Sequence, residues 1–330
     1  MKVCVFGAGG IGAYLGSALH RGGCDVSLVD QGEHLRAIQD SGLQFLHGGN
    51  REVLRLPACA PGEVTGAFDY VVIAVKTWSM PAALDAIAGL LHDQCTVVSA
   101  HNGIPWWYFH PEAHCSGARH LDSVDPGGAQ WRALDAARAL GCVIYPACEI
   151  DGPGVVRHIS GNRVALGEPD GTKSARAQAL SRALRAGGVK APVKTDIRND
   201  LWLKLVGNLA FNPLSVLSGA TLAQLCADAH TRTLARDMMR EGQAVATALG
   251  ARLAIDIEQR IDGAAAVGAH KTSMLQDFEA GLPLELDPVI GAVRELGRLC
   301  AVATPAIDRV HAEVLDSLRR RDLAAAEAAG

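Results

Sequence analysis

The sequence lacks a hydrophobic run long enough to cross a membrane, since no apolar stretch reaches about 18 residues. It also lacks the pattern of a secretory signal peptide, because the opening MKVCVFGAGG becomes rich in glycine before an apolar segment can form. A surplus of positive charge is missing too: the formal net charge is -4, which gives no basic field for nucleic acid or an anionic membrane. These absences predict a cytoplasmic protein that binds neither membranes nor nucleic acids.

Cysteine is present, but without the pattern of a disulfide framework or a zinc ribbon. The nine cysteines are scattered, odd in number and form no Cys-x-x-Cys motif, which fits a reducing compartment. His110, His114, Cys115 and His120 lie close together in the sequence, but their spacing matches no common metal-binding motif. We therefore predict no metal site.

A glycine-rich motif lies between the first predicted strand and the first predicted helix. Residues 2–6, KVCVF, predict a short buried strand, and Gly7, Gly9 and Gly12 then form G-x-G-x-x-G before an apolar helical run. In this setting the glycines permit a tight turn, close approach of a pyrophosphate, and packing of the helix on the strand. The helix N-terminus adds free N–H groups for the phosphates. The motif predicts dinucleotide binding, with a glycine-rich turn in an unrelated α/β protein as the alternative. The residues predicted to bind the cofactor here are Gly7, Gly9, Gly10, Ile11 and Gly12.

Polar residues follow three further predicted strands, at 25–30, 69–75 and 95–99. Asp30 ends the first of these, at the position where an acidic residue usually binds the adenosine ribose; a helix N-cap or a loop aspartate is the alternative. Lys76 follows the second strand, at an edge where open parallel sheets bind ligands. Asn102 follows the third, and we predict that it reaches the nicotinamide ribose or the substrate, unless it forms an ordinary Asn-Gly turn.

Four adjacent aromatic residues, Trp106 to Phe109, come directly after this segment. Four consecutive large side chains are not expected to face one core. We therefore predict that some of them line a cleft or an interface.

The second half of the sequence changes character. A chain of 330 residues is typical of two domains, and a hydrophobic content of 49% supports sizeable cores. Residues 122–167 alternate short strands and turns and are expected to complete a sheet, and 168–171, EPDG, is predicted to mark the domain boundary. The remainder predicts helices, followed by a frayed end of about eight residues. These helices are expected at 174–187, 197–212, 221–249, 258–269, 288–302 and 305–321.

These patterns predict an α/β N-terminal domain of the doubly wound Rossmann type, which binds the dinucleotide, over residues 1–170. They predict an all-α C-terminal domain over residues 171–330, which supplies substrate-binding and catalytic groups. The cleft between two such domains is the expected ligand site.

One predicted helix carries a polar stripe. Lys204, Asn208 and Asn212 are four residues apart and share a face, while most of the remaining circumference is apolar. Polar groups on a buried helix need partners, so the stripe is expected to face a ligand. The alternative is a simple ion pair between Lys204 and Asp200, which extends the stripe backwards. Pro213 is expected to bend or end this helix.

A polar segment, residues 270–277, lies between two predicted helices. Ser273 lies within it, and Glu285 follows 12 residues later. Loops carry functional residues more often than helix faces do. The alternative is a solvated connector in which Ser273 caps a helix.

Together these motifs resemble the ketopantoate reductase (2-dehydropantoate 2-reductase) family. The resemblance covers almost the whole chain and is specific only in combination. It rests on GAGGIG, a lysine at the end of a sheet strand, HNG at 101–103, W-x-K-x-x-x-N-x-x-x-N-P at 202–213, SMLQD at 273–277 and a glutamate 12 residues past the serine.

The resemblance implies NAD(P)H-dependent reduction of a small 2-oxo acid, ketopantoate to pantoate, in pantothenate and coenzyme A biosynthesis. It implies that Lys204 is the general acid that protonates the carbonyl oxygen, and that Glu285 pairs with Lys204 and the substrate hydroxyl. An ammonium group aimed at the oxygen would stabilise the charge that develops there. The implied binding residues are Ser273 and Asn102 for the 2-oxo acid, Asn208 and Asn212 for its distal part, and Lys76 beside cofactor and substrate.

Two departures from the family pattern bear on specificity. The family commonly has a basic residue after the second strand to hold the 2'-phosphate of NADPH, whereas this sequence has Asp30 and Gln31, so we predict a preference for NADH. The bulky run Pro105 to Phe109 follows HNG and keeps a second hypothesis open, a D-2-hydroxyacid dehydrogenase with a larger substrate. A third hypothesis is a non-catalytic dinucleotide sensor. A homodimer through the helical domain is also open.

Overall fold

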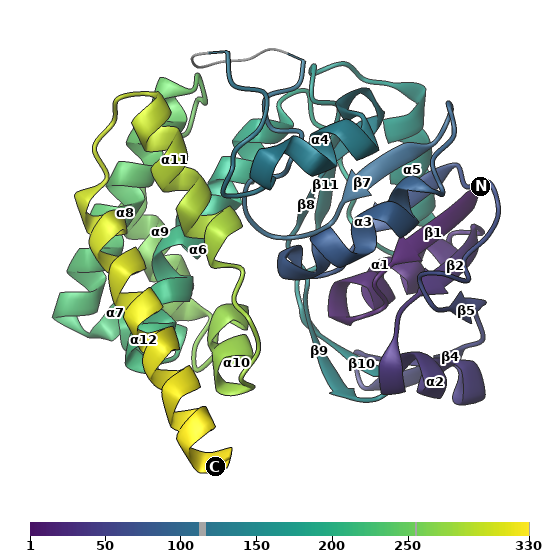
Figure 1. Ribbon diagram of the computed structural model, residues 1–330, viewed down its shortest axis with the longest axis horizontal. Helices are drawn as coiled ribbons and strands as arrows, with labels where there is room; N and C mark the ends of the chain where they lie inside the picture. The colour runs from purple at the N-terminus through teal and green to yellow at the C-terminus, as the bar shows by residue number, and fades with distance from the viewer. Residues whose placement is uncertain (112–116, 255, 330) are drawn as a thin grey trace. The chain divides into compact units, whose positions relative to one another are not determined.

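The computed structural model of the protein describes residues 1–111, 117–254 and 256–329, so His114 and Cys115 lie outside the described residues. The chain forms two compact units (Figure 1). The first consists of Met1–Glu112 and Gly127–Asp200, and the second of Ala113–Pro126 and Leu201–Gly330. Among the described residues, no helix combines the length and the low polarity that a membrane span requires.

The first unit is built on a seven-stranded sheet with the strand order β11-β8-β7-β6-β1-β2-β5. Every pairing is parallel except that of β11 with β8. The central strands are continuous apolar runs such as VCVF and YVVI, as expected for parallel strands covered on both faces. The strands are β1 (Lys2–Phe6), β2 (Asp25–Val29), β5 (Ala58–Cys59), β6 (Tyr70–Ile73), β7 (Thr96–Ser99), β8 (Ala139–Ile144) and β11 (Val164–Gly167).

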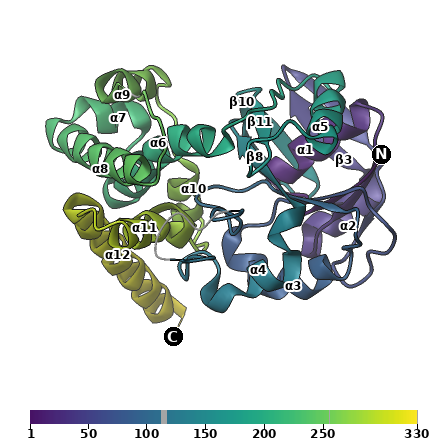
Figure 2. The same ribbon diagram turned by 90° about the horizontal axis from the view of Figure 1, so that it is seen from above.

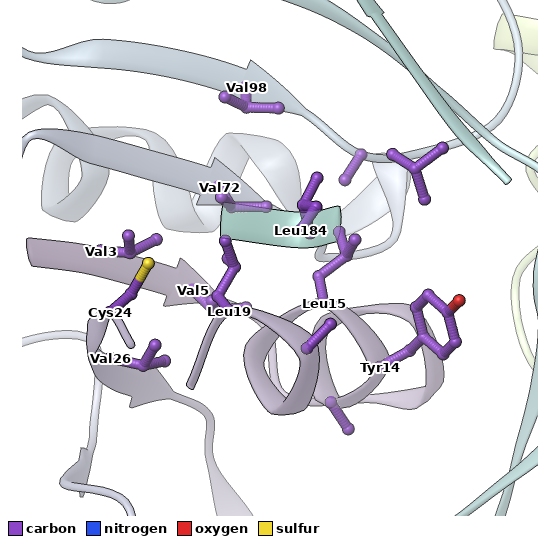
Figure 3. Close-up of a cluster of buried hydrophobic side chains, with 14 of the residues drawn as sticks. Val3, Val5, Tyr14, Leu15, Leu19, Cys24, Val26, Val72, Val98 and Leu184 are labelled. Carbon is purple, nitrogen blue, oxygen red and sulfur yellow. The ribbon is translucent and has the colours of Figure 1, made fainter. Parts of the chain in front are cut away.

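Helices cover both faces of this sheet, which confirms the predicted doubly wound α/β domain. Helices α3 and α4 pack together on one face, and α1 and α5 pack together on the other (Figure 2). Leu15 and Leu19 of α1 point into a core with Val5 and Val72 of the sheet and Leu184 of α5 (Figure 3). The helices are α1 (Gly10–Arg21), α2 (Gly32–Ser41), α3 (Met80–Ala88), α4 (Ala129–Leu134) and α5 (Ala175–Ala186), with short 3-10 turns η1 (Thr77–Ser79), η2 (Pro126–Gly128) and η3 (Ala136–Arg138).

A second sheet, of four strands in the order β4-β3-β10-β9, packs against α1. Its strands are β3 (Leu43–His47), β4 (Asn50–Leu54), β9 (Ala147–Gly152) and β10 (Val155–Ser160). The prediction that residues 122–167 complete one sheet was therefore wrong for β9 and β10. They form a hairpin that pairs with β3, a strand for which the sequence analysis made no prediction.

The start of that same range belongs to the second unit. The carboxylate of Glu295 accepts hydrogen bonds from the backbone N–H groups of Asp122 and Ser123, both 2.9 Å, and from the Ser123 hydroxyl at 2.6 Å. These hydrogen bonds connect the segment to α11 of the second unit.

The second unit is helical among its described residues, as predicted. Helices α7, α8 and α9 pack together, and α8 also contacts α11 and α12 (Figure 2). The elements are α6 (Ile197–Ser218), which begins in the first unit, α7 (Leu222–Ala227), α8 (Ala229–Ala248), α9 (Ile257–Ala266), α10 (Ser273–Glu279), a π-helical turn η4 (Asp287–Gly291), α11 (Ala292–Leu299) and α12 (Pro305–Ala329).

Three predicted helix boundaries were wrong. Helix α6 continues through Pro213 to Ser218, and the Ser215 hydroxyl donates to the carbonyl of Asn212 at 2.7 Å beside the proline. The predicted helix 221–249 is two helices, because Asp228 is extended and its side chain accepts from the N–H of Thr231, which caps α8. The C-terminal residues, predicted to fray, continue α12 to Ala329.

Candidate active site

Four candidate segments leave the main sheet from one row of paired residues. Val29 pairs with Phe6, Phe6 with Ile73, and Ile73 with Ser99, and all four end their strands. The glycine-rich loop, Asp30, Lys76 and Asn102 follow these strand ends in the chain. The register therefore brings the cofactor-binding candidates to one edge of the sheet, where the strand order changes direction and open α/β sheets bind ligands.

The glycine-rich loop has the geometry that a pyrophosphate requires. Gly7 has a φ of +102°, and a Cβ added to Gly12 would lie only 1.7 Å from the Gly7 carbonyl oxygen. At Gly9, by contrast, the nearest atom in the described part of the chain would be Cδ1 of Ile150, 3.8 Å from an added Cβ. The backbone at Gly9 is thus open to an approaching phosphate, and Gly9 precedes the first N–H groups of α1, which have no partners within the helix.

Cys148 of β9 lies next to this helix N-terminus. Its carbonyl oxygen would be 3.0 Å from a Cβ added to Gly10. Burial raises the pKa of the Cys148 thiol to about 12. The thiol therefore stays neutral at physiological pH and adds no negative charge beside the phosphate site.

Asp30 is turned towards the glycine-rich loop. One carboxylate oxygen accepts from the backbone N–H of Ala8 at 2.6 Å, and the other from that of Gln31 at 2.8 Å. The N-cap of α2 is Gln31, so Asp30 is not a helix N-cap, the first of the two alternatives. A carboxylate oxygen has two lone pairs, so each can accept a second hydrogen bond.

His34 supports the same loop and was missed by the sequence analysis. Its Nδ1 accepts from the N–H of Gly154 at 3.1 Å, so the proton lies on Nε2, which donates to the carbonyl of Ala8 at 3.0 Å. The neutral imidazole thus ties the loop to the β9–β10 hairpin. No pattern around His34 indicates this, because Gly154 is 120 residues away in sequence.

The aromatic run after Asn102 is buried, so it does not line an open cleft, one of the two predicted environments. Trp106, Trp107, Tyr108 and Phe109 are all 1–2% exposed. The indole N–H of Trp106 donates to the Ser99 hydroxyl at 3.0 Å. The rings of Tyr108 and Phe109 meet edge to face. The chain turns within this run, with hydrogen bonds from the N–H of Tyr108 to the carbonyl of Pro105 and from the N–H of His110 to the carbonyl of Trp107, and all four consecutive aromatic residues are buried.

In the second unit, α6 carries Lys204, Asn208 and Asn212 on one stripe, as predicted. Lys204 and Asn208 are half-buried and Asn212 is 7% exposed, and most of the apolar residues around them are buried. Asp200, at the start of the helix, pairs with Arg163 and with Lys194, whose Nζ lies 3.2 Å away. Its carboxylate is held by two cations of the first unit, so the alternative of a simple Asp200–Lys204 pair does not describe it.

Ser273 is the first residue of α10, and a neighbouring hydroxyl chain anchors it. The cap is Thr272, whose hydroxyl oxygen accepts from the N–H of Leu275 at 3.2 Å. The Thr272 and Ser215 hydroxyl oxygens are 2.6 Å apart. Because Ser215 uses its only proton on the carbonyl of Asn212, Thr272 is the donor to Ser215. The chain joins the start of α10 to α6 at Asn212, and Ser273 itself is exposed.

Glu285 lies between α10 and the π-helical turn η4, and it is 7% exposed. A carboxylate this deeply buried needs partners, and the structure provides them. Single π-helical turns are frequent at functional sites. The second unit therefore contains the five predicted substrate-binding and catalytic residues other than Asn102, on α6, α10 and the segment before η4.

The first unit is defined by its fold and loop as a dinucleotide-binding domain, and it is joined to a helical unit with a polar lysine face. The family model for ketopantoate reductase PanE/ApbA matches residues 3–171, and the model for its C-terminal part matches residues 196–316. The chain belongs to the ketopantoate reductase family, which confirms the resemblance seen in its motifs, and the cofactor of this class of oxidoreductase is a nicotinamide dinucleotide.

Individual relatives agree with this assignment. A protein of Mesorhizobium japonicum named 2-dehydropantoate 2-reductase is 49% identical, over 95% of this chain and 97% of its own. A solved structure from Ralstonia solanacearum MolK2 is 34% identical with a TM-score of 0.91, covering 97% of this chain and 98% of its own. A D-mandelate dehydrogenase with NADH and anilino(oxo)acetate has a TM-score of 0.83 at 23% identity, covering 98% and 99%, which shows a shared fold.

Proposed function

We propose that the protein reduces a small 2-oxo acid, 2-dehydropantoate in the first instance, to the 2-hydroxy acid with a reduced nicotinamide dinucleotide. The observation that carries this proposal is the lysine and amide stripe of α6, which lies within the region matched by the family model. The 49% identical relative named for this activity supports the choice of substrate.

The proposed chemistry divides between cofactor and protein. The bound reduced nicotinamide supplies the hydride. Lys204 donates the proton to the carbonyl oxygen, and its ammonium charge stabilises the negative charge that develops there. Glu285, buried in the same unit, orients Lys204 and accepts from the substrate hydroxyl. Holding both groups on a packed helix and a buried segment keeps the geometry fixed before reaction, which lowers its entropic cost.

Binding and orientation of the substrate fall to neutral polar groups in this proposal. Ser273 and Asn102 hold the 2-oxo acid, and Asn208 and Asn212 hold its distal part. Lys76, at the carboxyl end of β6, lies by the cofactor and substrate. In the first unit, the pyrophosphate is assigned to the loop of Gly7, Gly9, Gly10, Ile11 and Gly12.

A panel of 2-oxo acids with NADH and NADPH tests the proposal and separates it from its competitors. The panel should include 2-dehydropantoate, pyruvate and phenylglyoxylate. A preference for phenylglyoxylate would support the D-2-hydroxyacid dehydrogenase, although the buried Trp106 and Trp107 remove the reason for expecting a bulky substrate. Tight cofactor binding without turnover of any member would indicate a sensor. Light scattering would test the homodimer.

Lys204→Ala is the matching variant. We expect turnover to fall by about 100-fold or more, the magnitude typical of general acid catalysis, while cofactor affinity changes little. Lys271→Ala is the control, because Lys271 forms a surface pair with Glu279 in the same unit, with N–O distances of 2.7 and 2.8 Å. Near-normal turnover of Lys204→Ala would show that the stripe is structural.

NADH is the cofactor that the proposal favours over NADPH. Asp30 presents a carboxylate beside the glycine-rich loop, and Gln31 adds no charge. A carboxylate accepts hydrogen bonds from the ribose hydroxyls of NADH and repels the 2'-phosphate of NADPH. Arg36 is exposed on α2 and is the cation nearby in the sequence that would favour NADPH instead, by neutralising its 2'-phosphate.

A further inference from the structure

Gly207, in the middle of α6, contacts the guanidinium group of Arg260 on α9. Gly207 is buried among helix-forming residues, although glycine is among the poorest helix formers. A Cβ added there would lie 2.8 Å from Nη2, 3.1 Å from Nε and 3.3 Å from Cζ of Arg260 on α9. Three atoms of one guanidinium group lie at nearly equal distance, so the planar group rests against the helix where a side chain is missing.

This contact is adjacent to the proposed general acid. Gly207 follows Lys204 by three residues, and side chains at that spacing are neighbours on a helix surface, with about 5–6 Å between their Cβ positions. It also directly precedes Asn208. Arg260 is half-buried, and its guanidinium group lies against α6 at Gly207. Lys204 on α6 and Arg260 on α9, which contacts α6 at Gly207, are two positive charges within about one helical turn, and together they favour an anion.

A 2-oxo acid is such an anion, and the other proposed substrate contacts in the second unit, Ser273, Asn208 and Asn212, are neutral. A carboxylate that leaves water needs a cationic partner, and a guanidinium group matches its two oxygens with two parallel N–H donors. We infer that Arg260, seated on Gly207, binds the carboxylate of the 2-oxo acid and makes the site selective for acids over neutral ketones. This inference rests on the proposed function.

The first experiment compares a 2-oxo acid with its primary amide, which keeps the carbonyl and loses the charge. We expect Arg260→Gln to raise the KM for the acid by about 10- to 100-fold, the loss typical of a charged hydrogen-bonded pair, and to leave kcat and the KM for the amide nearly unchanged. Arg260→Lys should restore part of the loss, because it keeps the charge without the fork.

The second experiment uses the glycine. In Gly207→Ala the new Cβ would lie 2.8 Å from Nη2, so the guanidinium group must move. Alanine favours a helix, so this variant is expected to fold and melt at or above the temperature of the wild type. We expect it to raise the KM for the acid as Arg260→Gln does, and the double variant to be no worse than either. Arg232→Gln is the control, because Arg232 pairs with Glu258 and Asp262 on the exposed side of α9.

Failure of the inference can be told from failure of the proposed function. If the wild type reduces 2-oxo acids and Arg260→Gln keeps the same preference for the acid over the amide, Arg260 does not bind the carboxylate. If the wild type reduces none of them, the proposed function fails, and calorimetry of 2-dehydropantoate with the NAD⁺-bound protein still decides the inference. Equal affinity of wild type and Arg260→Gln in that titration would overturn it, and a loss of about 10-fold or more would support it.

Discussion

At the scale of single residues, Asp30 predicts a cofactor preference that differs from the one usual in the family. We expect a higher kcat/KM with NADH than with NADPH. A phosphate near a carboxylate at a partly exposed site costs on the order of 1–3 kcal/mol, or roughly 5- to 150-fold in affinity. Asp30→Ala should move the ratio of the two efficiencies towards NADPH, while turnover at saturating NADH stays nearly intact.

The control for this prediction is Asp25→Ala, since Asp25 is exposed at the start of β2, the strand that Asp30 follows. Its effect on the ratio should be negligible. Equal or better use of NADPH by the unaltered protein would contradict the prediction, and would point to Arg36 as the group that neutralises the 2'-phosphate.

Residues whose function depends on local sequence were the predictable ones. The spacing of Gly7, Gly9 and Gly12 predicted the loop, because each glycine is required by the local geometry of the turn and of its near neighbours. His34 could not be found this way, since its two partners come from the loop before α1 and from the β9–β10 hairpin. Arg260 was missed for the same reason: its contact is with Gly207, in another helix.

At the scale of elements, the hydroxyl chain at the start of α10 should position Ser273. Thr272→Val removes both the cap and the donor to Ser215. Loss of a cap typically costs about 0.5–2 kcal/mol of stability. We also expect the KM for the 2-oxo acid to rise several-fold, because Ser273 and Asn212 lose their link, and Thr272→Ser to behave nearly as the wild type.

Thr221→Val separates this effect from simple loss of stability. Thr221 caps α7 in the same unit through a capping box with Gln224. We expect a comparable fall in stability without a change in the KM. A KM that is unchanged in Thr272→Val would show that the hydroxyl chain serves folding alone.

The junction of α11 and α12 predicts a dependence of stability on pH. His311 accepts a hydrogen bond from Arg294 through Nδ1 at 2.8 Å, and Arg294 also pairs with Asp308 at 2.5 Å. Burial, together with the adjacent guanidinium group, lowers the pKa of His311 from 6.5 to about 4. Between these two pH values His311 is protonated in the unfolded chain but not in the folded chain. The free energy of unfolding therefore falls as the pH falls from about 6.5 towards 4.

Melting temperatures at pH 7.5 and pH 5 test this. We expect His311→Gln to lose less stability than the wild type over that interval, because glutamine keeps an acceptor and does not titrate. Identical losses in both proteins would show that His311 is not a source of the pH dependence. His230, on α8, provides a control in His230→Gln, since it is exposed.

Helix type was easier to predict than helix extent. The apolar circumference of residues 200–214 correctly indicated a buried helix, but Pro213 did not end it, because packing of Leu214 and Val216 continues the helix to Ser218. Local propensity is a weak guide where tertiary burial opposes it. The break at Asp228 had a recognisable local cause in its preference for capping positions.

At the scale of the whole molecule, the layer structure of each unit followed from hydrophobic patterns. The sequence analysis predicted a boundary near residue 170, the two family models match residues 3–171 and 196–316, and α5 packs on α1 within a first compact unit that extends to Asp200. The start of the Asp122–Pro126 segment is hydrogen-bonded to the carboxylate of Glu295 on α11, about 170 residues away, which no local pattern reveals.

The proposal assigns cofactor binding to the first unit and proton donation to the second. A variant of each unit should therefore respond differently when NADH is added and the melting temperature is measured. NADH that binds only the folded protein should stabilise it by RT ln(1 + [L]/Kd), about 2.7 kcal/mol at about 100 times Kd. Gly9 has an ordinary φ of -64° and the nearest described atom to an added Cβ is 3.8 Å away, so Gly9→Val should fold normally. Its larger side chain would occupy the approach of the pyrophosphate.

We expect Gly9→Val to lose the upward shift in melting temperature with NADH, and Lys204→Ala to keep that shift while losing turnover. A Lys204→Ala protein that no longer responds to NADH would contradict the division, because it would place the lysine among the groups that hold the cofactor rather than those that act on the carbonyl.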